Sequence, residues 1–455
     1  MSAGMGADCR RLSDAELFSA AVDVLDANRT PHGTRASPHL YPHQWSWDAA
    51  FIAAGLAVID TSRARAELDL LHAGQWANGM IPHIVFAPDA GGYFPGPERW
   101  ACASVSPHAP HGVATSGIIQ PPVHALALAA IMEADAGQQL HTDAWQGAAL
   151  QKVAAWHRYL VRERTDSTTG LITLFHGWES GMDNSPRWDA PYGKVAPGKD
   201  LPPYVRRDTH HVGSDSERPQ DEEYNRYLWL LEEGKRVGYE ASAWKVAGSF
   251  QVGDVFATAV FARACDVAAT CADSLQMRDV ADEMRNFADG ARHAVRVHCD
   301  AGSGLAHDVD LASGMPLRTD TIAGFAPLLC FTSSDAEFAA AQRTLFSADW
   351  CTAEGLAFPL PPSTAPQSPA FEEERYWRGP VWPIMNWLLG WALGEGGDAE
   401  GAAHLRAHGL DQLRDGTFAE YYQPYDGSPL GSMKQSWTAA AALMWLAQGA
   451  SIPGR

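Results

Sequence analysis

The sequence predicts an all-α protein whose helices pack in two concentric layers. Hydrophobic residues recur at helical spacing in about a dozen segments of the 455-residue chain, whereas strand-like patterns are short and scattered. Several segments are apolar nearly all round, as at 123–132 and 256–267. A helix without a polar face is buried on every side, and an inner layer of helices inside an outer layer would bury it in this way.

The first helix is expected to begin with the capping box Ser13-Asp14-Ala15-Glu16, in which the Ser13 and Glu16 side chains satisfy free N–H groups reciprocally. The same four-residue signal recurs at 334–337 and predicts a second such start. The clearest strand signal is 172–175. The other helices are expected at 47–60, 62–77, 122–136, 141–163, 222–234, 250–271, 274–298, 320–330, 380–394, 398–414 and 434–448.

Long loops rich in Pro, Gly, His and aromatic residues separate these helices. Several exceed the roughly 12–15 residues of an ordinary structureless connection, which indicates functional loops. No Pro/Ser/Gly linker and no exact repeat divides the chain, so residues 1–455 are expected to form a single domain. The loops lie at 29–46, 79–121, 175–221, 347–379 and 415–433.

The charge balance narrows the classes of partner. The chain carries 34 basic and 54 acidic residues, a formal net charge of -20. Nucleic acids and anionic membranes are therefore disfavoured, because both need a basic surface. No run of 18 apolar residues predicts a membrane span, and the N-terminus lacks the apolar stretch of a secretory signal.

Cysteine and histidine spacing predicts no metal and no cofactor. The seven cysteines are an odd number, and Cys265 and Cys271 are too far apart for a zinc motif. They are expected to be mostly buried free thiols in a reducing compartment, which favours the cytoplasm. His83, His108, His111 and His124 are irregularly spaced, and no glycine-rich phosphate loop follows a strand, so no nucleotide is expected.

Aromatic loops that carry carboxylates on a helical scaffold indicate a carbohydrate ligand. Sugar C–H faces lie on aromatic rings, and sugar hydroxyls bond to carboxylates and amides. Cleavage of a glycosidic bond further needs two carboxyl groups, one acting as acid and one as base or nucleophile. Two segments combine these residue types most densely: 177–189 has three carboxylates and two tryptophans, and 418–437 has Glu420 between aromatic residues. Turn chemistry alone would explain 183–186, but not the flanking tryptophans.

Two further segments supply aromatic walls. Residues 41–48 carry Tyr41, two tryptophans and Asp48, although Asp48 is equally explained as a carboxylate at a helix N-terminus. Residues 375–383 are aromatic without an evident acid and predict a binding wall. Spacing alone does not show that Asp183 and Glu420 meet in space.

Taken in order, these four segments resemble glycoside hydrolase family 63, most closely its branch of bacterial glucosylglycerate and mannosylglycerate hydrolases. Further matching stretches lie at 78–86, 92–97, 115–122 and 227–233, so the resemblance covers nearly the whole chain. It implies an (α/α)6 barrel, a double ring of twelve helices, with a cap over the active site formed by inserted loops at about 79–121 and 175–235.

The resemblance also implies the reaction and the residues that perform it. The expected reaction is inverting hydrolysis of the α-glycosidic bond of glucosylglycerate, and of mannosylglycerate as a second candidate. Asp183 falls on the general acid and Glu420 on the general base, about 6.5–9.5 Å apart in an inverting site. Glucose contacts fall on Tyr41, Trp45, Ser46, Trp47, Asp48, Trp178, Gly181, Tyr376, Trp377 and Gln435.

The glycerate end of such a substrate carries a carboxylate, which wants a charged bidentate donor. Arg218 matches the family position for that role, and Tyr93, Gln120 and Tyr224 would complete the glycerate site. The residues alone equally allow Arg218 to be a surface arginine paired with Glu217 or Asp221.

Residue types and spacing alone leave three other functions open. A neutral disaccharide hydrolase, trehalase-like or α-glucosidase-like, would have no need of Arg218. A sugar epimerase on a helical toroid would use histidines such as His83 and His124 for proton transfer. A non-catalytic carbohydrate binder would need only the aromatic residues. An outer apolar face could also support a homo-oligomer.

Overall fold

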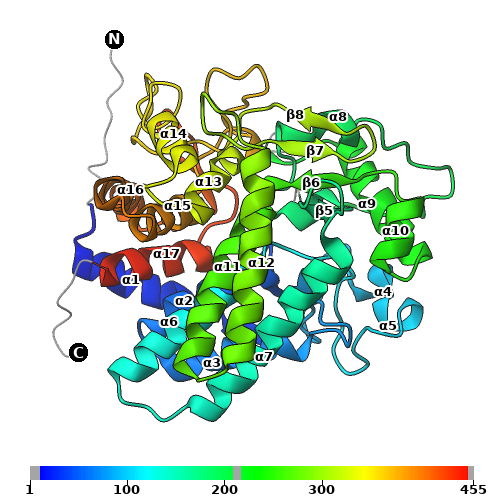
Figure 1. Ribbon diagram of the computed structural model, residues 1–455, viewed down its shortest axis with the longest axis horizontal. Helices are drawn as coiled ribbons and strands as arrows, with labels where there is room; N and C mark the ends of the chain where they lie inside the picture. The colour runs from blue at the N-terminus through cyan, green and yellow to red at the C-terminus, as the bar shows by residue number, and fades with distance from the viewer. Residues whose placement is uncertain (1–10, 209–216, 449–455) are drawn as a thin grey trace.

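Twelve α-helices form two rings in the part of the chain that the computed structural model describes, residues 11–208 and 217–448 (Figure 1). The inner ring consists of α2 (Ser46–Ala57), α6 (His124–Gly137), α11 (Val255–Ser274), α13 (Ala326–Cys330), α15 (Pro383–Glu395) and α17 (Ser436–Ala447). The outer ring consists of α1 (Asp14–Ala27), α3 (Thr61–Ala73), α7 (Asp143–Tyr159), α12 (Arg278–Val297), α14 (Ala336–Leu345) and α16 (Ala399–Gln412).

The inner ring is closed. Each inner helix contacts the next one along the chain, and α17 contacts both α15 and α2. The chain alternates between the rings, so that pairs such as α2 with α3, α11 with α12, and α15 with α16 pack as antiparallel hairpins. This arrangement is the (α/α)6 barrel that the family resemblance implies.

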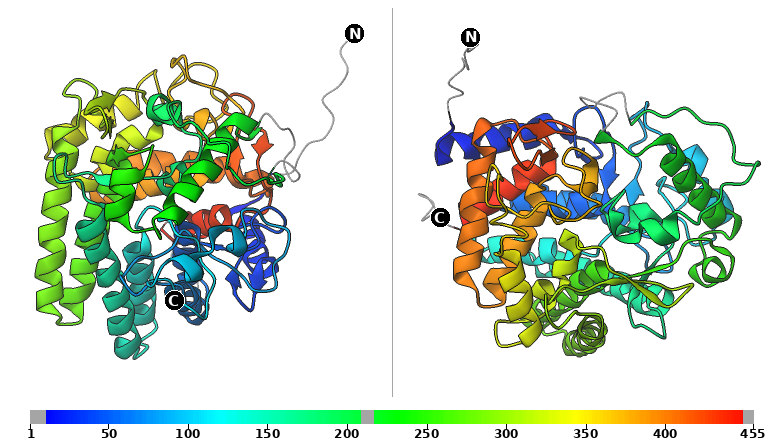
Figure 2. Two further views of the ribbon diagram at one scale, coloured as in Figure 1. Left: turned by 90° about the vertical axis from the view of Figure 1, so that its right-hand side faces the viewer. Right: turned by 90° about the horizontal axis from the view of Figure 1, so that it is seen from above.

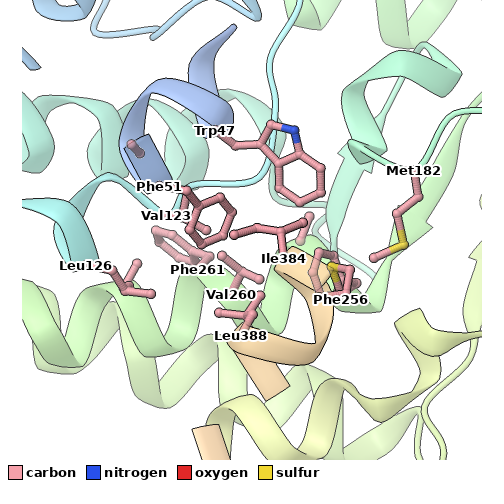
Figure 3. Packing of buried hydrophobic residues seen from close by; sticks show 14 of the residues in the cluster. Trp47, Phe51, Val123, Leu126, Met182, Phe256, Val260, Phe261, Ile384 and Leu388 are labelled. Atoms are coloured by element: carbon pink, nitrogen blue, oxygen red, sulfur yellow. The ribbon is translucent and has the colours of Figure 1, made fainter. Parts of the chain in front are cut away.

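Apolar composition explains which helices lie inside. Every residue of α2 is buried, and a Cβ on its Gly55 would come within 2.5 Å of the Ala440 Cβ of α17, so only small residues permit this close approach. Figure 3 shows large side chains of the inner helices meeting in the core, among them Phe51 of α2, Phe261 of α11 and Ile384 of α15. Burying one such side chain contributes about 1.5–3 kcal/mol.

The inner helix α11 is long and apolar enough to cross a membrane by length and composition alone. Most of its apolar stretch is buried, and it contacts α6, α7, α12 and α13. Packing on all sides therefore accounts for its composition as that of a core helix.

The two predicted capping boxes have different outcomes. At α1 the prediction is confirmed, since Ser13 N–H donates to Glu16 Oε2 at 2.9 Å and Glu16 N–H donates to Ser13 Oγ at 3.4 Å. At 334–337 it is wrong, because α14 begins after Asp335 and no side chain caps it. The Asp335 carboxylate instead accepts from the backbone of Thr332, at 3.0 Å.

A four-stranded antiparallel sheet lies beside the barrel, near one end of α11 and α12 (Figure 1). The strand signal at 172–175 is confirmed as its first strand, and the other three were not foreseen because three residues are too few to show an alternating pattern. The first strand leads directly into the segment around Asp183. The strands are β5 (Ile172–Leu174), β6 (Val252–Asp254), β7 (Asp308–Asp310) and β8 (Met315–Leu317).

Two long insertions interrupt the ring, one between α3 and α6 and one between α7 and α11, and they meet where α5 contacts α9 (Figure 2). The first holds β4 (Ile84–Val85), α4 (Pro97–Trp100) and α5 (Cys102–Val105). The second holds a π-helix (Leu160–Arg164), β5, 3-10 turns (Gly177–Ser180, Pro186–Trp188), α8 (Asp189–Tyr192), α9 (Asp221–Arg236), α10 (Ala241–Ala247) and β6. The helix predicted at 222–234 is therefore α9, outside the ring.

Short hairpins complete the fold. Two-stranded pairs join β1 (Arg29–Thr30) with β2 (Gly33–Thr34), β3 (Gln44–Trp45) with β4, and β9 (Tyr421–Tyr422) with β10 (Pro429–Leu430). Six cysteines lie in the described residues, all as free thiols and five of them buried. The seventh, Cys9, lies outside the described residues.

Candidate active site

A cavity of about 200 Å³ collects side chains from the aromatic loops and from both insertions. Fifteen of the sixteen predicted site residues line it. They are Tyr41, Trp45, Trp47, Asp48, Tyr93, Gln120, Trp178, Gly181, Asp183, Arg218, Tyr224, Tyr376, Trp377, Glu420 and Gln435.

Ser46 is the predicted residue that is not among the cavity's lining. Its Oγ lies 2.9 Å from His124 Nε2, and its N–H donates to the His83 carbonyl at 2.9 Å. Successive side chains of a helix project about 100° apart, so at the start of α2 Trp47 and Asp48 face the cavity while Ser46 faces α6. A substrate contact by Ser46 stays a prediction.

Local backbone geometry brings Asp183 into the cavity. Gly181 has a φ of 70°, and a Cβ there would come within 2.7 Å of the Trp47 ring, so glycine is required for the turn. No side chain in residues 11–208 or 217–448 donates a hydrogen bond to the Asp183 carboxyl. Burial raises its pKa to about 8, the Arg218 guanidinium opposes this rise, and the Glu420 charge adds to it.

The other two carboxylates of segment 177–189 have structural partners. Glu179 forms a buried ion pair with Arg164 and accepts from Phe175 N–H at 2.7 Å. Asp189 binds Arg378 through both oxygens, at 3.0 and 2.8 Å. Of the three acids, Asp183 alone faces the cavity, which makes it the candidate proton donor.

Glu420 lies just before β9, and several donors hold its carboxylate. Tyr41 Oη donates to Oε1 at 2.9 Å, Tyr376 Oη lies 3.4 Å from the same oxygen, and Ser432 N–H donates to Oε2 at 3.1 Å. Arg218 Nη2 is 3.7 Å from Oε2. The pKa of Glu420 is raised from its usual value, because burial raises it more than the Arg218 charge and the hydrogen bonds from Ser432 and Tyr41 lower it.

Asp48 is a third carboxyl in the same cavity. Burial raises its pKa well above the usual value, and the charges of Glu420 and Asp183 add to the rise, while a bond to its own backbone lowers it. Its place in the first turn of α2 also agrees with the helix N-terminus interpretation. Asp48 is therefore both a carboxylate at a helix N-terminus and a residue of the cavity wall, because the first turn of α2 borders the cavity.

Arg218 is the buried cation of this site. Its exposed fraction is 5%, and its guanidinium lies 4.6 Å from the centre of the Tyr376 ring. The alternative of a surface arginine is wrong because the side chain is buried, and Asp221 pairs with Arg206, at 2.8 Å. Within the described chain, Arg218 Nε and Nη2 have no hydrogen-bond partner. Nη2 faces Glu420 at 3.7 Å, and Nε is a buried donor available to an anionic ligand.

Several residues that line the cavity were not predicted as substrate contacts from the sequence, including His83, Arg207, Asp208 and Trp437. Burial, together with nearby His176, lowers the pKa of His83 well below its usual value, so its ring is neutral. His83 and Trp437 stand inside stretches that were already singled out, and their aromatic neighbours were the available signal. Arg207 and Asp208 lie in a segment without any motif.

The histidines considered as metal ligands do not gather. His83 lines the cavity, His124 contacts Ser46, and His108 lies 3.5 Å from Glu240. Within the described ranges, no group of three or more His, Cys, Asp or Glu side chains is placed to hold a metal ion.

The comparison with known proteins agrees with this geometry. Residues 41–438 match the family described as the mannosylglycerate hydrolase MGH1-like glycoside hydrolase domain. The chain belongs to this family. It is 48% identical over 437 residues to the glucosylglycerate hydrolase of Mycolicibacterium hassiacum, covering 95% of this chain and 98% of the relative. It is 38% identical to the mannosylglycerate hydrolase of Thermus thermophilus, covering 93% of this chain and 99% of that protein.

Solved structures give the same result. The crystal structure of glycoside hydrolase family 63 mannosylglycerate hydrolase from Thermus thermophilus in complex with Tris and D-glycerate matches with a TM-score of 0.85 at 37% identity, over 94% of this chain and 99% of that one. Neutral trehalase Nth1 from Saccharomyces cerevisiae matches with a TM-score of 0.55 at 13% identity, which reflects the fold alone. The chain is a glycoside hydrolase, so the epimerase and non-catalytic interpretations are set aside.

Proposed function

We propose that this glycoside hydrolase cleaves the α-glycosidic bond of 2-O-(α-D-glucosyl)-D-glycerate, releasing glucose and D-glycerate, with mannosylglycerate as a second substrate. The observation that carries the proposal is Arg218, a buried cation in the cavity that holds Asp183 and Glu420, with two donors that no hydrogen bond within the described chain satisfies. Glu420 lies 3.7 Å from Nη2, but a neutral disaccharide would bring no anionic acceptor for Nε, and a buried donor without an acceptor is costly. The names of the relatives at 36–48% identity support both substrates.

Asp183 acts as the general acid and donates its proton to the glycosidic oxygen. Its pKa of about 8 keeps it protonated at neutral pH. Glu420 acts as the general base and takes a proton from the water that attacks the anomeric carbon. The hydroxyl groups of Tyr41 and Tyr376 and the charge of Arg218 favour the ionised form that this role needs.

The two ends of the substrate occupy different parts of the wall. The glucosyl ring takes the tryptophan-rich side, with Tyr41, Trp45, Trp47, Asp48, Trp178, Gly181, Tyr376, Trp377 and Gln435. The glycerate takes Tyr93, Gln120, Arg218 and Tyr224. Residues 79–121 and 175–235 serve as the cap, a role supported by the lining residues that each contributes, such as Gln120 and Tyr224. The free thiols favour a reducing compartment, and so the cytoplasm.

Proton NMR of early turnover with α-glucosylglycerate tests substrate and stereochemistry together. Release of β-glucose first is the expected result. Early α-glucose would keep the substrate and refute the inverting pair. Cleavage of neutral α-glucosides with no reaction on glucosylglycerate would refute the glycerate acceptor.

Three variants assign the catalytic roles. Asp183→Asn and Glu420→Gln should each abolish turnover in a folded protein, whereas Glu400→Gln changes an exposed carboxylate on α16 and should not. Hydrolysis that survives in both of the first two variants would overturn the assignment.

A further inference from the structure

The loop before α15 carries two arginines that flank Tyr376 and bind carboxylates from distant segments. Arg375 pairs with Glu223 in the first turn of α9, and it also binds both oxygens of Glu372, at 3.0 and 3.1 Å. Arg375 and Glu223 are mostly buried, with 13% and 16% of their side chains exposed. One guanidinium thus ties the Tyr376 loop to the helix that carries Tyr224.

The same network reaches the segment of the proposed acid. Asn184 follows Asp183, and with its side-chain amide assigned in the orientation that satisfies both groups, its nitrogen donates to Glu223 Oε1 at 2.8 Å and its oxygen accepts from Arg375 Nε at 3.3 Å. Arg378 adds a second link, because it binds Asp189 through two hydrogen bonds. Three parts of the cavity wall are joined at this one cluster.

Two residues in this network have left-handed backbone conformations. Tyr376 has a φ of 38° and Asn184 a φ of 65°. Asparagine tolerates this region, but a tyrosine pays a steric cost there and keeps the conformation only where its surroundings fix it. The conformation has a consequence, since Tyr376 Oη lies 3.1 Å from Tyr41 Oη and 3.4 Å from Glu420 Oε1.

We propose that Arg375 is a positioning residue that holds Tyr376 and Asn184 in these conformations, and so places the hydroxyl donors of Glu420 and the Asp183 side chain for reaction. The inference rests on the proposed function. It assigns to the charged residues of this loop a role separate from substrate contact. Arg375 acts through Tyr376 on one side and through Asn184 on the other.

Arg375→Gln is the first test. It removes the pairs with Glu223 and Glu372, and kcat/KM for glucosylglycerate should fall about 100-fold, the loss that follows from misplacing a reacting group by about 1 Å. The acidic limb of the pH profile should also move to higher pH, because Glu420 keeps its charge less easily without an aligned Tyr376 hydroxyl. Arg375→Lys should recover part of the rate, since an ammonium keeps the charge but does not span all three partners.

A double-mutant cycle separates positioning from general loss of structure. In the Tyr376→Phe background the hydroxyl is already absent, so adding Arg375→Gln should move the acidic limb no further. The matched control is Arg285→Gln on α12, an arginine that also pairs with two carboxylates, Asp273 and Asp282, and its rate should stay within about twofold of the unchanged enzyme.

An equal shift of the acidic limb in both backgrounds, or an unchanged rate in Arg375→Gln, would overturn the proposal. If Arg375→Gln does not fold, Arg375→Lys and Glu372→Gln carry the same comparison. Hydrogen exchange gives a readout that needs no substrate: in the variant, protection should fall at 372–382 and 183–189 and stay unchanged in α12. Local loosening in an enzyme that does not cleave glucosylglycerate would refute the proposed function and support the positioning role of Arg375. Loosening throughout the barrel would refute that positioning role.

Discussion

Arg218→Gln is the substitution that most directly tests the charge logic of the site. It removes a buried guanidinium that lies 3.7 Å from Glu420 Oε2. Two effects follow, and they differ in how they depend on the substrate. The glycerate carboxylate loses its charged donor, whereas Glu420 and Asp183 lose a positive charge that lowers the pKa of each.

The magnitudes of the two effects can be worked out separately. A hydrogen bond to a charged group is worth about 1.5–3 kcal/mol, so kcat/KM for glucosylglycerate should fall about 10- to 150-fold through the lost contact alone. At 3.7 Å the attraction between Arg218 and the Glu420 carboxylate is about 1 kcal/mol in water and about 4.5 kcal/mol at an effective dielectric constant of about 20. This second effect applies equally to anionic and neutral substrates.

The assay compares glucosylglycerate with neutral glucosylglycerol over a range of about pH 5 to pH 10. Removing a positive charge raises the pKa of both carboxyl groups, so both limbs of the bell-shaped profile should move to higher pH for both substrates. Above the acidic limb, glucosylglycerate alone should show the further loss of about 10- to 150-fold.

Equal losses for the two substrates would refute a role of Arg218 in binding the carboxylate. A profile that moves to lower pH would refute the electrostatic argument, because losing a positive charge near two acids raises the pKa of each.

Three further results are expected. In the unchanged enzyme kcat/KM should fall above about pH 8, because Asp183, with its pKa of about 8, loses the proton it donates; a rate that stays level well above pH 8 would contradict this. Arg187→Met leaves Asp254 and Asp308 buried without their cation and should lower the free energy of unfolding by about 3–5 kcal/mol in urea denaturation. That loss should be smaller below pH 6 than above it, since burial raises the pKa of Asp308 to about 6 and the protonated acid needs no cation. Gly304 has a φ of 70°, and a Cβ added there would lie 2.2 Å from Ala341 N, so Gly304→Ala should lower the free energy of unfolding by about 2 kcal/mol or more. Gly290 lies on α12 with open space around it, so Gly290→Ala should raise the free energy of unfolding by about 0.5–1 kcal/mol.

The sequence predicted the ring of helices because the inner helices have no polar face, as in α2 and α17, and only a double layer buries such helices. It did not predict the four-stranded sheet, whose strands have three residues each. The expected capping box at 334–337 failed because the Asp335 carboxylate binds Thr332 and Arg296 instead. Local signals were thus reliable where burial of a whole face enforced them, and unreliable where one side chain had a choice of partners.

For the active site, residue type was more informative than position. Aromatic loops with carboxylates identified the cavity wall, but this pattern did not distinguish Asp183 from Glu179. Only the ion pair with Arg164, seen in the structure, identifies Glu179 as a structural residue. The segment 375–383 was interpreted as a binding wall without an acid, and the meaning of its arginines was missed. Arg375 and its partner Glu223 are 152 residues apart, and such a pair leaves no local pattern.

The roles proposed for Asp183 and Glu420 differ because the surroundings of the two carboxyl groups differ. Burial raises the pKa of both groups. Glu420 has two tyrosine hydroxyls and a backbone N–H as neighbours and a guanidinium beside it, all of which favour its charge. Asp183 has no donor from a described side chain, so burial dominates and the proton stays. Exchanging these surroundings would exchange the order of the two pKa values, because donors around a buried carboxyl lower its pKa and burial without them leaves it raised.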